Sequence, residues 1–251
     1  MKIVLLANDR VGLAVAKYLK SRKEDIVALV LHPEDKAKMS KEIRTVFPQV
    51  PVFFADKLRE DDTLERIARL KADLAISAWF GYILKPEFIN LFSSGVVNFH
   101  NSYLPLNRGK YPHVWALASG SKYGVTLHYI DAGIDTGPII ARREVEINPT
   151  DIAGTLYERA LDVIVQLFKD TWSALRAWKI KPLVQKAKAT HHFAREVAEL
   201  DCIDLKKKYS GGDLINQLRS RSFKDRSYAY FLHKGKKIYV RVELSEKPEF
   251  K

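Results

Sequence analysis

Two polar side chains stand at the end of an apolar run near the middle of this 251-residue chain. Asn98 and His100 belong to the run Gly-Val-Val-Asn-Phe-His, which predicts a β-strand over residues 95–99. Side chains two positions apart on a strand point the same way, so we expect both on one face. An amide donates hydrogen bonds and an imidazole exchanges a proton near neutral pH, which suits this pair to acid–base chemistry.

An Asn-x-His pair alone is weak evidence for a site, because a single His is more often structural. A second polar segment further along the chain strengthens the case. Residues 124–137 read Gly-Val-Thr-Leu-His-Tyr-Ile-Asp-Ala-Gly-Ile-Asp-Thr-Gly, with His128 on a predicted strand and Asp135 in the loop after it. From the residues alone, the preferred interpretation of Asp135 is a turn carboxylate that bonds its own loop.

The elements that must position these residues alternate along the chain. Apolar, β-rich runs lie at residues 2–7, 26–32, 51–54, 73–79 and 95–99, and the clearest helical segments between them lie at 12–22 and 56–70. This alternation predicts an α/β fold with a Rossmann-like, doubly wound, mostly parallel sheet. Strands over 124–130 and 138–147 and a helix over 152–178 follow. In such sheets, ligands bind at the carboxyl ends of the strands, where Asn98 and His100 lie.

The composition of the chain changes after Pro182. A lysine-rich connector is followed by a predicted short helix around 213–221 and by a run over 228–244 in which apolar and polar residues alternate. The run is interrupted by His-Lys-Gly-Lys and predicts a β-hairpin. We therefore expect a catalytic domain over 1–185 and a small C-terminal extension over 186–251. A hairpin cannot stand alone, so it should pack on the main domain or on a second subunit, and its exposed edge favours a homodimer.

Composition excludes several classes of protein. The 47% hydrophobic content is that of a packed globular protein, and the apolar runs are far shorter than the ~20 residues of a membrane span. No signal-peptide pattern precedes the first strand, so we expect a cytoplasmic location. Cys202 is the only cysteine, which leaves no intrachain disulfide and no Cys pair for zinc. The net charge of +12 suggests an anionic partner, either nucleic acid, a phosphorylated substrate or a polyanionic cofactor.

The first strand-to-helix turn excludes a dinucleotide cofactor. A Gly-x-Gly-x-x-Gly fingerprint would be needed there, and only Gly12 is present. The helix start could still hold a phosphate with the help of Arg10. The alternative, in which Asn8 or Asp9 merely caps that helix, is equally supported.

The two polar segments together resemble the folate-dependent formyltransferases. The family pattern is Asn-x-His with a Ser-x-Leu-Pro turn, then Gly-x-Thr-x-His and an Asp-x-Gly loop, and each part occurs here in order. The resemblance is strong over residues 70–150. Asn101 departs from it, because the family usually has Pro after the His. His128 also matches a family position and is equally well interpreted as a structural group.

The resemblance implies a reaction and its residues. The formyl donor would be N10-formyltetrahydrofolate, and no metal is required. Asn98 would donate a hydrogen bond to the oxyanion of the tetrahedral intermediate, His100 would act as base and second donor, and Asp135 would orient the imidazole. The pterin pocket would be lined by Trp79, Phe80, Tyr82, Ile83 and Leu84 and by Asp131, Ala132, Gly133 and Ile134. From the residues alone, the first of these segments is a buried strand end.

The length of the C-terminal tail distinguishes the members of the family. This tail is longer than that of the glycinamide ribonucleotide transformylases and shorter than that of the methionyl-tRNA formyltransferases, and it resembles the tail of the nucleotide-sugar N-formyltransferases. That resemblance implies a dTDP-linked acceptor, either dTDP-4-amino-4,6-dideoxyglucose or a dTDP-3-amino sugar, for the synthesis of O-antigen or another surface glycan. Basic and aromatic groups suit a diphosphate and a flat base. Our candidates for binding this substrate are Asn8, Arg10, Ser102, Arg108, Lys110, Tyr228 and Tyr230. Packing on the main domain is the alternative for the two tyrosines.

Other functions remain open at this point. Methionyl-tRNA and glycinamide ribonucleotide formyltransferases resemble the same domain, as do hydrolases that release formate from formylfolate. The alternative from another class is a basic α/β module that binds nucleic acid and has no turnover; it predicts salt-sensitive binding. We expect the nucleotide sugar and folate as partners, and neither nucleic acid nor a membrane.

Overall fold

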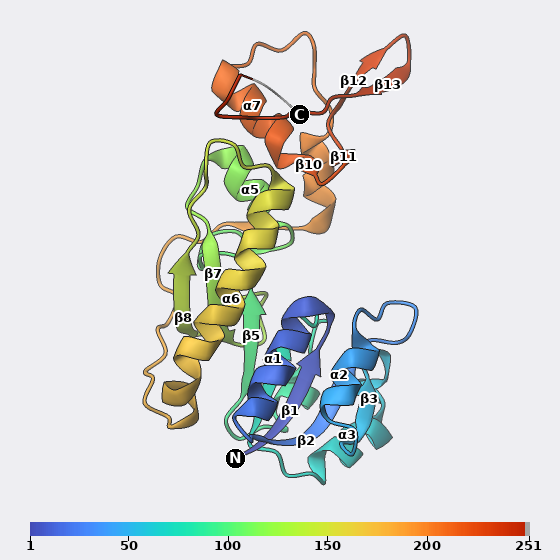
Figure 1. The fold of residues 1–251 in the computed structure, drawn as a ribbon, viewed down its shortest axis with the longest axis vertical. Helices are drawn as coiled ribbons and strands as arrows, with labels where there is room; N and C mark the ends of the chain where they lie inside the picture. The colour runs from blue at the N-terminus through green and yellow to red at the C-terminus, as the bar shows by residue number, and fades with distance from the viewer. Residues whose placement is uncertain (249–251) are drawn as a thin grey trace. The chain divides into compact units, whose positions relative to one another are not determined.

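The computed structural model describes residues 1–248 and divides into two compact units (Figure 1). The first contains Met1–His100, Thr126–Arg142 and Ile164–Lys186. The second contains Asn101–Val125, Arg143–Val163 and, of the residues described, 187–248. Among the described residues, no helix has the length and apolar character needed to cross a membrane.

Within the described residues, the main sheet has seven strands in the order β3-β2-β1-β4-β5-β7-β8. They are β1 (Lys2–Ala7), β2 (Asp25–Leu31), β3 (Val52–Phe54), β4 (Leu74–Ala78), β5 (Val96–His100), β7 (Gly124–Tyr129) and β8 (Ile139–Glu144). Neighbouring strands from β3 to β5 are parallel, and β7 is antiparallel to β5. The prediction of a doubly wound, mostly parallel sheet is confirmed.

The central strands are apolar because both faces of the sheet are covered. The last five residues of β1 are fully buried, which is typical of a strand with helices on both sides. Helix α1 (Asp9–Ser21) follows β1 directly and buries Val11, Val15 and Leu19. Gly12 permits this close approach, because a Cβ there would lie only 3.0 Å from the Cβ of Ala7. The polar residues after β1 are thereby held at the carboxyl end of the sheet.

The remaining helices of the first unit are α2 (Ser40–Val46), α3 (Asp61–Ala68) and α4 (Pro86–Ile89), with a 3-10 turn at Ala55–Lys57. The helix predicted over 56–70 is thus shorter, since its regular part begins only at Asp61, where two aspartates favour a helix start. The long helix α6 (Ala153–Arg176) packs Phe168 against Phe99 of β5 at 5.1 Å between ring centroids. This contact supports the strand that carries Asn98 and His100.

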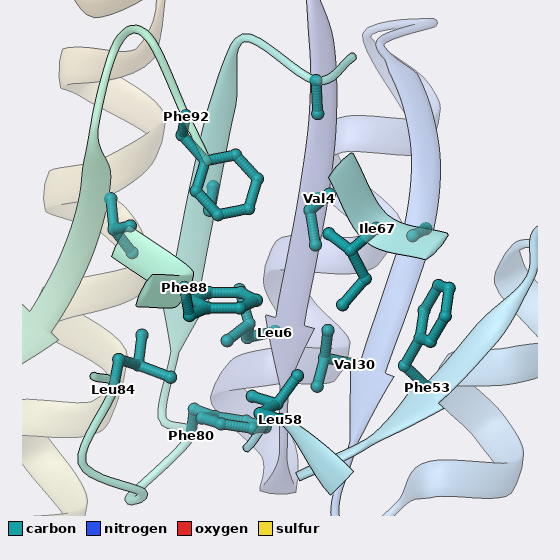
Figure 2. Close-up of a cluster of buried hydrophobic side chains, with 14 of the residues drawn as sticks. Val4, Leu6, Val30, Phe53, Leu58, Ile67, Phe80, Leu84, Phe88 and Phe92 are labelled. Atoms are coloured by element: carbon teal, nitrogen blue, oxygen red, sulfur yellow. The ribbon is translucent and has the colours of Figure 1, made fainter. Parts of the chain in front are cut away.

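One face of the sheet packs a large apolar cluster (Figure 2). Val4 and Leu6 of β1 and Val30 of β2 lie beside aromatic and aliphatic side chains from the segments that cross the sheet. Figure 2 shows Phe80 and Leu84 at the end of the cluster towards which the arrow of β1 points. The segment after β4 is therefore anchored in the core at the carboxyl edge.

The second unit contains the C-terminal extension and the loops after β5. Its elements are β6 (Arg108–Gly109), α5 (Pro112–Ser119), β9 (His191–His192), a 3-10 helix at Ala194–Leu200, α7 (Gly211–Ser220), β10 (Ser222–Phe223), β11 (Arg226–Ser227), β12 (Tyr230–His233) and β13 (Lys236–Tyr239). Helices α5 and α7 pack together, and Tyr123 Oη donates to Asn101 Oδ1 at 2.6 Å. The predicted hairpin forms as β12 and β13, paired antiparallel from Tyr230 with Tyr239 to His233 with Lys236.

Candidate active site

Strand pairing brings Asn98, His100 and His128 together in the first unit. In the β5–β7 register, Asn98 lies opposite His128 and His100 lies opposite Thr126. Residues that are directly opposite on antiparallel strands have their side chains close together on one face. Both histidines are buried, and their ring centroids lie 6.1 Å apart. The expectation that Asn98 and His100 share a face is consistent with this register.

Asp135 reaches the same cluster from the loop between β7 and β8. Its Oδ1 lies 3.4 Å from Nδ1 of His100 and 3.6 Å from Nε2 of His128. The backbone of Asp135 adopts a left-handed conformation with φ of 53°, a cost that the surrounding loop must compensate. The carboxylate therefore faces both imidazoles.

Gln185, in the last chain segment of the first unit, holds the Asp135 loop. Its Nε2 donates to the backbone oxygen of Asp135 at 3.0 Å and to that of Gly137 at 2.7 Å. The turn itself is closed by Asp131, whose Oδ1 accepts from the backbone N–H of Gly133 at 3.1 Å and from Thr136 Oγ1. Two independent anchors thus fix the position of the carboxylate.

Hydrogen bonds define the roles of Asn98 and His128. Nδ1 of His128 lies 2.7 Å from the backbone oxygen of Tyr129. A carbonyl can only accept, so this ring nitrogen carries the proton. In the neutral ring, Nε2 is then an acceptor, and the Nδ2 of Asn98 lies 3.2 Å away as its donor.

The arrangement can support acyl transfer. An amide donor and an imidazole at one place can stabilise an oxyanion and move a proton. A carboxylate beside the imidazole orients the ring and stabilises its protonated form. Within residues 1–248, no group of three or more His, Cys, Asp or Glu side chains is arranged to hold a metal ion.

The segment predicted to line the pterin pocket divides into buried and exposed parts. Phe80 and Leu84 are buried in the apolar cluster, whereas Ile83 is exposed. Trp79 and Gly81 have positive φ angles of 61° and 75°, so the chain turns sharply after β4. In the second predicted segment, residues 131–134, Ile134 is also exposed.

His32 is a polar residue at this edge that the sequence interpretation missed. It follows β2 directly, and its Nε2 donates to the backbone oxygen of Phe80. The signal that could have found it is the one used for His100, because a His at the carboxyl end of a parallel strand lies on the ligand-binding edge.

The residues predicted to bind the substrate lie in both units. In the first, the Oδ1 of Asn8 accepts from the backbone N–H of Lys38 at 2.9 Å, and its side chain does not cap α1. Asp9 contacts Lys38 Nζ at 3.2 Å and accepts from the backbone N–H of Arg10. Asn8 and Asp9 therefore tie the loop after β2 to the first turn.

In the second unit, a short parallel pairing positions two further candidates. The backbone N–H groups of Arg108 and Lys110 donate to the backbone oxygens of Thr190 and His192, each at 2.9 Å. Ser102 is fully buried. The Tyr228 ring lies 4.8 Å from the Arg221 guanidinium, and the Tyr230 ring lies 4.3 Å from Lys237 Nζ. Binding of the substrate by these residues stays a prediction.

Two protein-family models match the chain. The model described as "Formyl transferase" matches residues 1–171, and the model described as "N-formyltransferase dimerization C-terminal domain" matches residues 196–246. A methionyl-tRNA formyltransferase from Thermodesulfovibrio yellowstonii is 34% identical over 75% of this chain, and the match spans 64% of that relative's length. A dTDP-4-amino-4,6-dideoxyglucose formyltransferase from Mycobacterium bovis is 33% identical over 74% of this chain and 81% of its own.

Solved structures show the same similarity. A candidate sugar N-formyltransferase from Mycobacterium tuberculosis has a TM-score of 0.81 and 27% identity, covering 98% of this chain and 99% of that one. The formyltransferase PseJ from Anoxybacillus kamchatkensis, solved with UDP-4,6-dideoxy-4-formamido-L-AltNAc and tetrahydrofolate, has a TM-score of 0.57 and 28% identity, covering 88% and 98%.

Proposed function

Because the chain belongs to the formyl transferase family, we propose that it moves the formyl group of N10-formyltetrahydrofolate onto the amino group of a nucleotide-linked amino-dideoxysugar. The observation that carries this proposal is the cluster in which Asp135 Oδ1 lies 3.4 Å from His100 Nδ1, beside the amide of Asn98. A carboxylate, an imidazole and an amide donor are the groups that formyl transfer to an amine requires.

The reaction uses each of these groups in turn. The acceptor nitrogen attacks the formyl carbon and forms the new C–N bond, and the carbonyl oxygen becomes an oxyanion that Asn98 stabilises. His100 takes the proton that the amine loses, with Asp135 stabilising the charged ring. The bond from the formyl carbon to N10 then breaks, and the proton passes to N10, which gives tetrahydrofolate and the formamido sugar.

Several similarities support an amino sugar as the acceptor. The M. bovis relative is named for dTDP-4-amino-4,6-dideoxyglucose, and the match covers most of its length. The PseJ structure holds a UDP-linked formamido sugar together with tetrahydrofolate. We propose dTDP-4-amino-4,6-dideoxyglucose as acceptor, or else a dTDP-3-amino sugar, in the synthesis of O-antigen or another surface glycan from a cytoplasmic pool.

Methionyl-tRNA is the second candidate acceptor. The relative from T. yellowstonii has slightly higher identity than the sugar enzyme, and the net charge of +12 fits tRNA as well as a diphosphate. Against this alternative, the match spans only 64% of that relative's length.

The chain is also proposed to form a homodimer. The name of the family model that matches its C-terminal part, "N-formyltransferase dimerization C-terminal domain", supports this.

A panel of acceptors tests the proposal. The chain is incubated with N10-formyltetrahydrofolate and with dTDP-, UDP- and GDP-linked 3-amino and 4-amino sugars, and initiator methionyl-tRNA serves as the competing substrate. We expect formylation of a dTDP-linked amino sugar at a kcat/KM at least about 10²-fold above that for the tRNA, since a site built for one acceptor leaves polar groups unpaired with another. Formylation of the tRNA alone overturns the choice of acceptor.

A further inference from the structure

His32 lies against the loop that follows β4. Its Nε2 donates to the backbone oxygen of Phe80, a residue that is distant in sequence and only 1% exposed. The imidazole also packs edge-on against two rings of that loop, with centroids 5.1 Å from Phe80 and 4.9 Å from Tyr82. One side chain at the end of β2 thus contacts both the backbone and the aromatic rings of the segment after β4.

The segment that His32 holds has an irregular backbone. Trp79 and Gly81 both have positive φ, and a Cβ at Gly81 would meet nothing within 4 Å, so this turn is not packed tightly on that side. A side-chain hydrogen bond to the carbonyl between these two residues selects one orientation of the Phe80 peptide.

Tyr82 provides a second, independent observation at the same place. Its hydroxyl is buried and has no hydrogen-bond partner within residues 1–248, while its ring packs against His32. A buried hydroxyl without a partner is unfavourable, so a molecule that brings a polar atom to it gains affinity. The contacts of His32 therefore lie at a position that is prepared for a ligand.

We propose that His32 is a positioning residue for the formyl donor. It holds the loop 79–84 in the shape that receives the pterin ring, by donating to the Phe80 carbonyl and by fixing the Tyr82 ring. This inference rests on the proposed function and on the expectation from the sequence that residues 79–84 line the pterin pocket. His32 touches neither reacting atom, so its loss should weaken donor binding and leave the chemical step intact.

A matched pair of variants isolates the hydrogen bond. Gln and Met have similar length and shape, but only Gln can donate to the Phe80 carbonyl. We expect His32→Met to raise the KM for N10-formyltetrahydrofolate about tenfold, with kcat within about threefold and the KM of the amino sugar unchanged, as follows from the loss of one buried hydrogen bond. His32→Gln should return the donor KM to within about threefold of the wild-type value. His32→Phe keeps the ring and lacks the donor, and it should behave like the Met variant.

Calorimetric measurement of 5-formyltetrahydrofolate binding to the full chain distinguishes failure of the proposed function from failure of the role assigned to His32. If the wild-type chain does not bind this probe, the proposed function fails. If the wild type binds it and both donorless variants bind it equally well while remaining folded, the role of His32 is overturned. Equal increases in the KM of donor and acceptor, or failure of His32→Gln to rescue, also contradict the proposal. Should one donorless variant fail to fold, the other provides the comparison with His32→Gln.

Discussion

The side-chain amide of Asn98 donates to Nε2 of His128 across the β5–β7 pair, at 3.2 Å. Because Nδ1 of His128 bonds the backbone oxygen of Tyr129, the neutral ring presents Nε2 as an acceptor and thereby fixes which way the amide points. His128 is only 2% exposed, so its ring is held by packing as well. His128 thus positions the group to which we assign oxyanion stabilisation.

Replacing His128 should lower turnover by misplacing the Asn98 amide. We expect His128→Phe to reduce kcat about 10²-fold, approaching the effect of removing an oxyanion donor, with the KM of both substrates within about threefold. Steady-state kinetics of the folded variant measure this. Wild-type kcat in His128→Phe would show that Asn98 needs no such support.

Gln185 should affect catalysis from outside the cluster, because it anchors the loop that carries Asp135. Gln185→Leu removes two hydrogen bonds, to the backbone oxygens of Asp135 and Gly137. We expect a fall in kcat of about tenfold, which corresponds to roughly 1.4 kcal/mol of lost positioning. The matched control is Gln166→Leu, since the side chain of Gln166 donates to the exposed Asp170 on the same helix, α6. Equal kcat values in the two variants would contradict the anchoring role.

His113 should make the stability of the chain depend on pH. Burial, and secondarily the charge of Arg221, lower its pKa from 6.5 to about 3. The unfolded chain therefore takes up a proton below about pH 6.5 that the folded chain refuses until about pH 3, so stability falls as the pH falls through this window. Between about pH 6.5 and pH 5 the loss is roughly 1.6 kcal/mol.

Urea unfolding of the wild type and of His113→Phe at both pH values measures the contribution of His113. The aromatic replacement suits the site, because His113 packs against the rings of Tyr157 and Phe223. We expect the variant to lose less stability on acidification than the wild type. An identical loss in both chains would show that His113 does not titrate as described.

The hairpin of β12 and β13 should contribute to a homodimer. Leu232 and Ile238 are exposed on a two-stranded sheet, and such a sheet is only marginally stable unless a partner covers it. We expect the wild type to elute as a dimer in size-exclusion chromatography with light scattering. The double variant Leu232→Lys with Ile238→Lys should be monomeric, whereas Leu183→Lys, also at an exposed leucine, should not change the mass. A wild-type monomer would remove the basis for this interface.

Local patterns predicted much of the fold and part of the site. The apolar runs of the central strands, with the helix after Gly12, indicated a parallel α/β sheet because buried strands have a continuous apolar sequence. Strand periodicity placed Asn98 and His100 on one face. Helices α2, α4 and α5 were not predicted, since each is short and two of them begin at a proline.

Tertiary pairing explains what the sequence could not provide. The contact between Asn98 and His128 depends on the register of β5 and β7, which no local pattern determines. The left-handed backbone of Asp135 and its support by Gln185 depend on contacts between distant segments. The boundary near residue 185 and the substrate residues remain predictions.

Formation of product by the wild type and by site variants tests the central claim most directly. Mass spectrometry follows the gain of one formyl group by a dTDP-linked amino-dideoxysugar in the presence of N10-formyltetrahydrofolate, with Asn98→Ala, His100→Ala and Asp135→Ala assayed beside the wild type. We predict product with the wild type, and rates lower by about 10²-fold or more in each folded variant. Near wild-type product formation by His100→Ala, or no formylated sugar with the wild-type chain, would contradict the account.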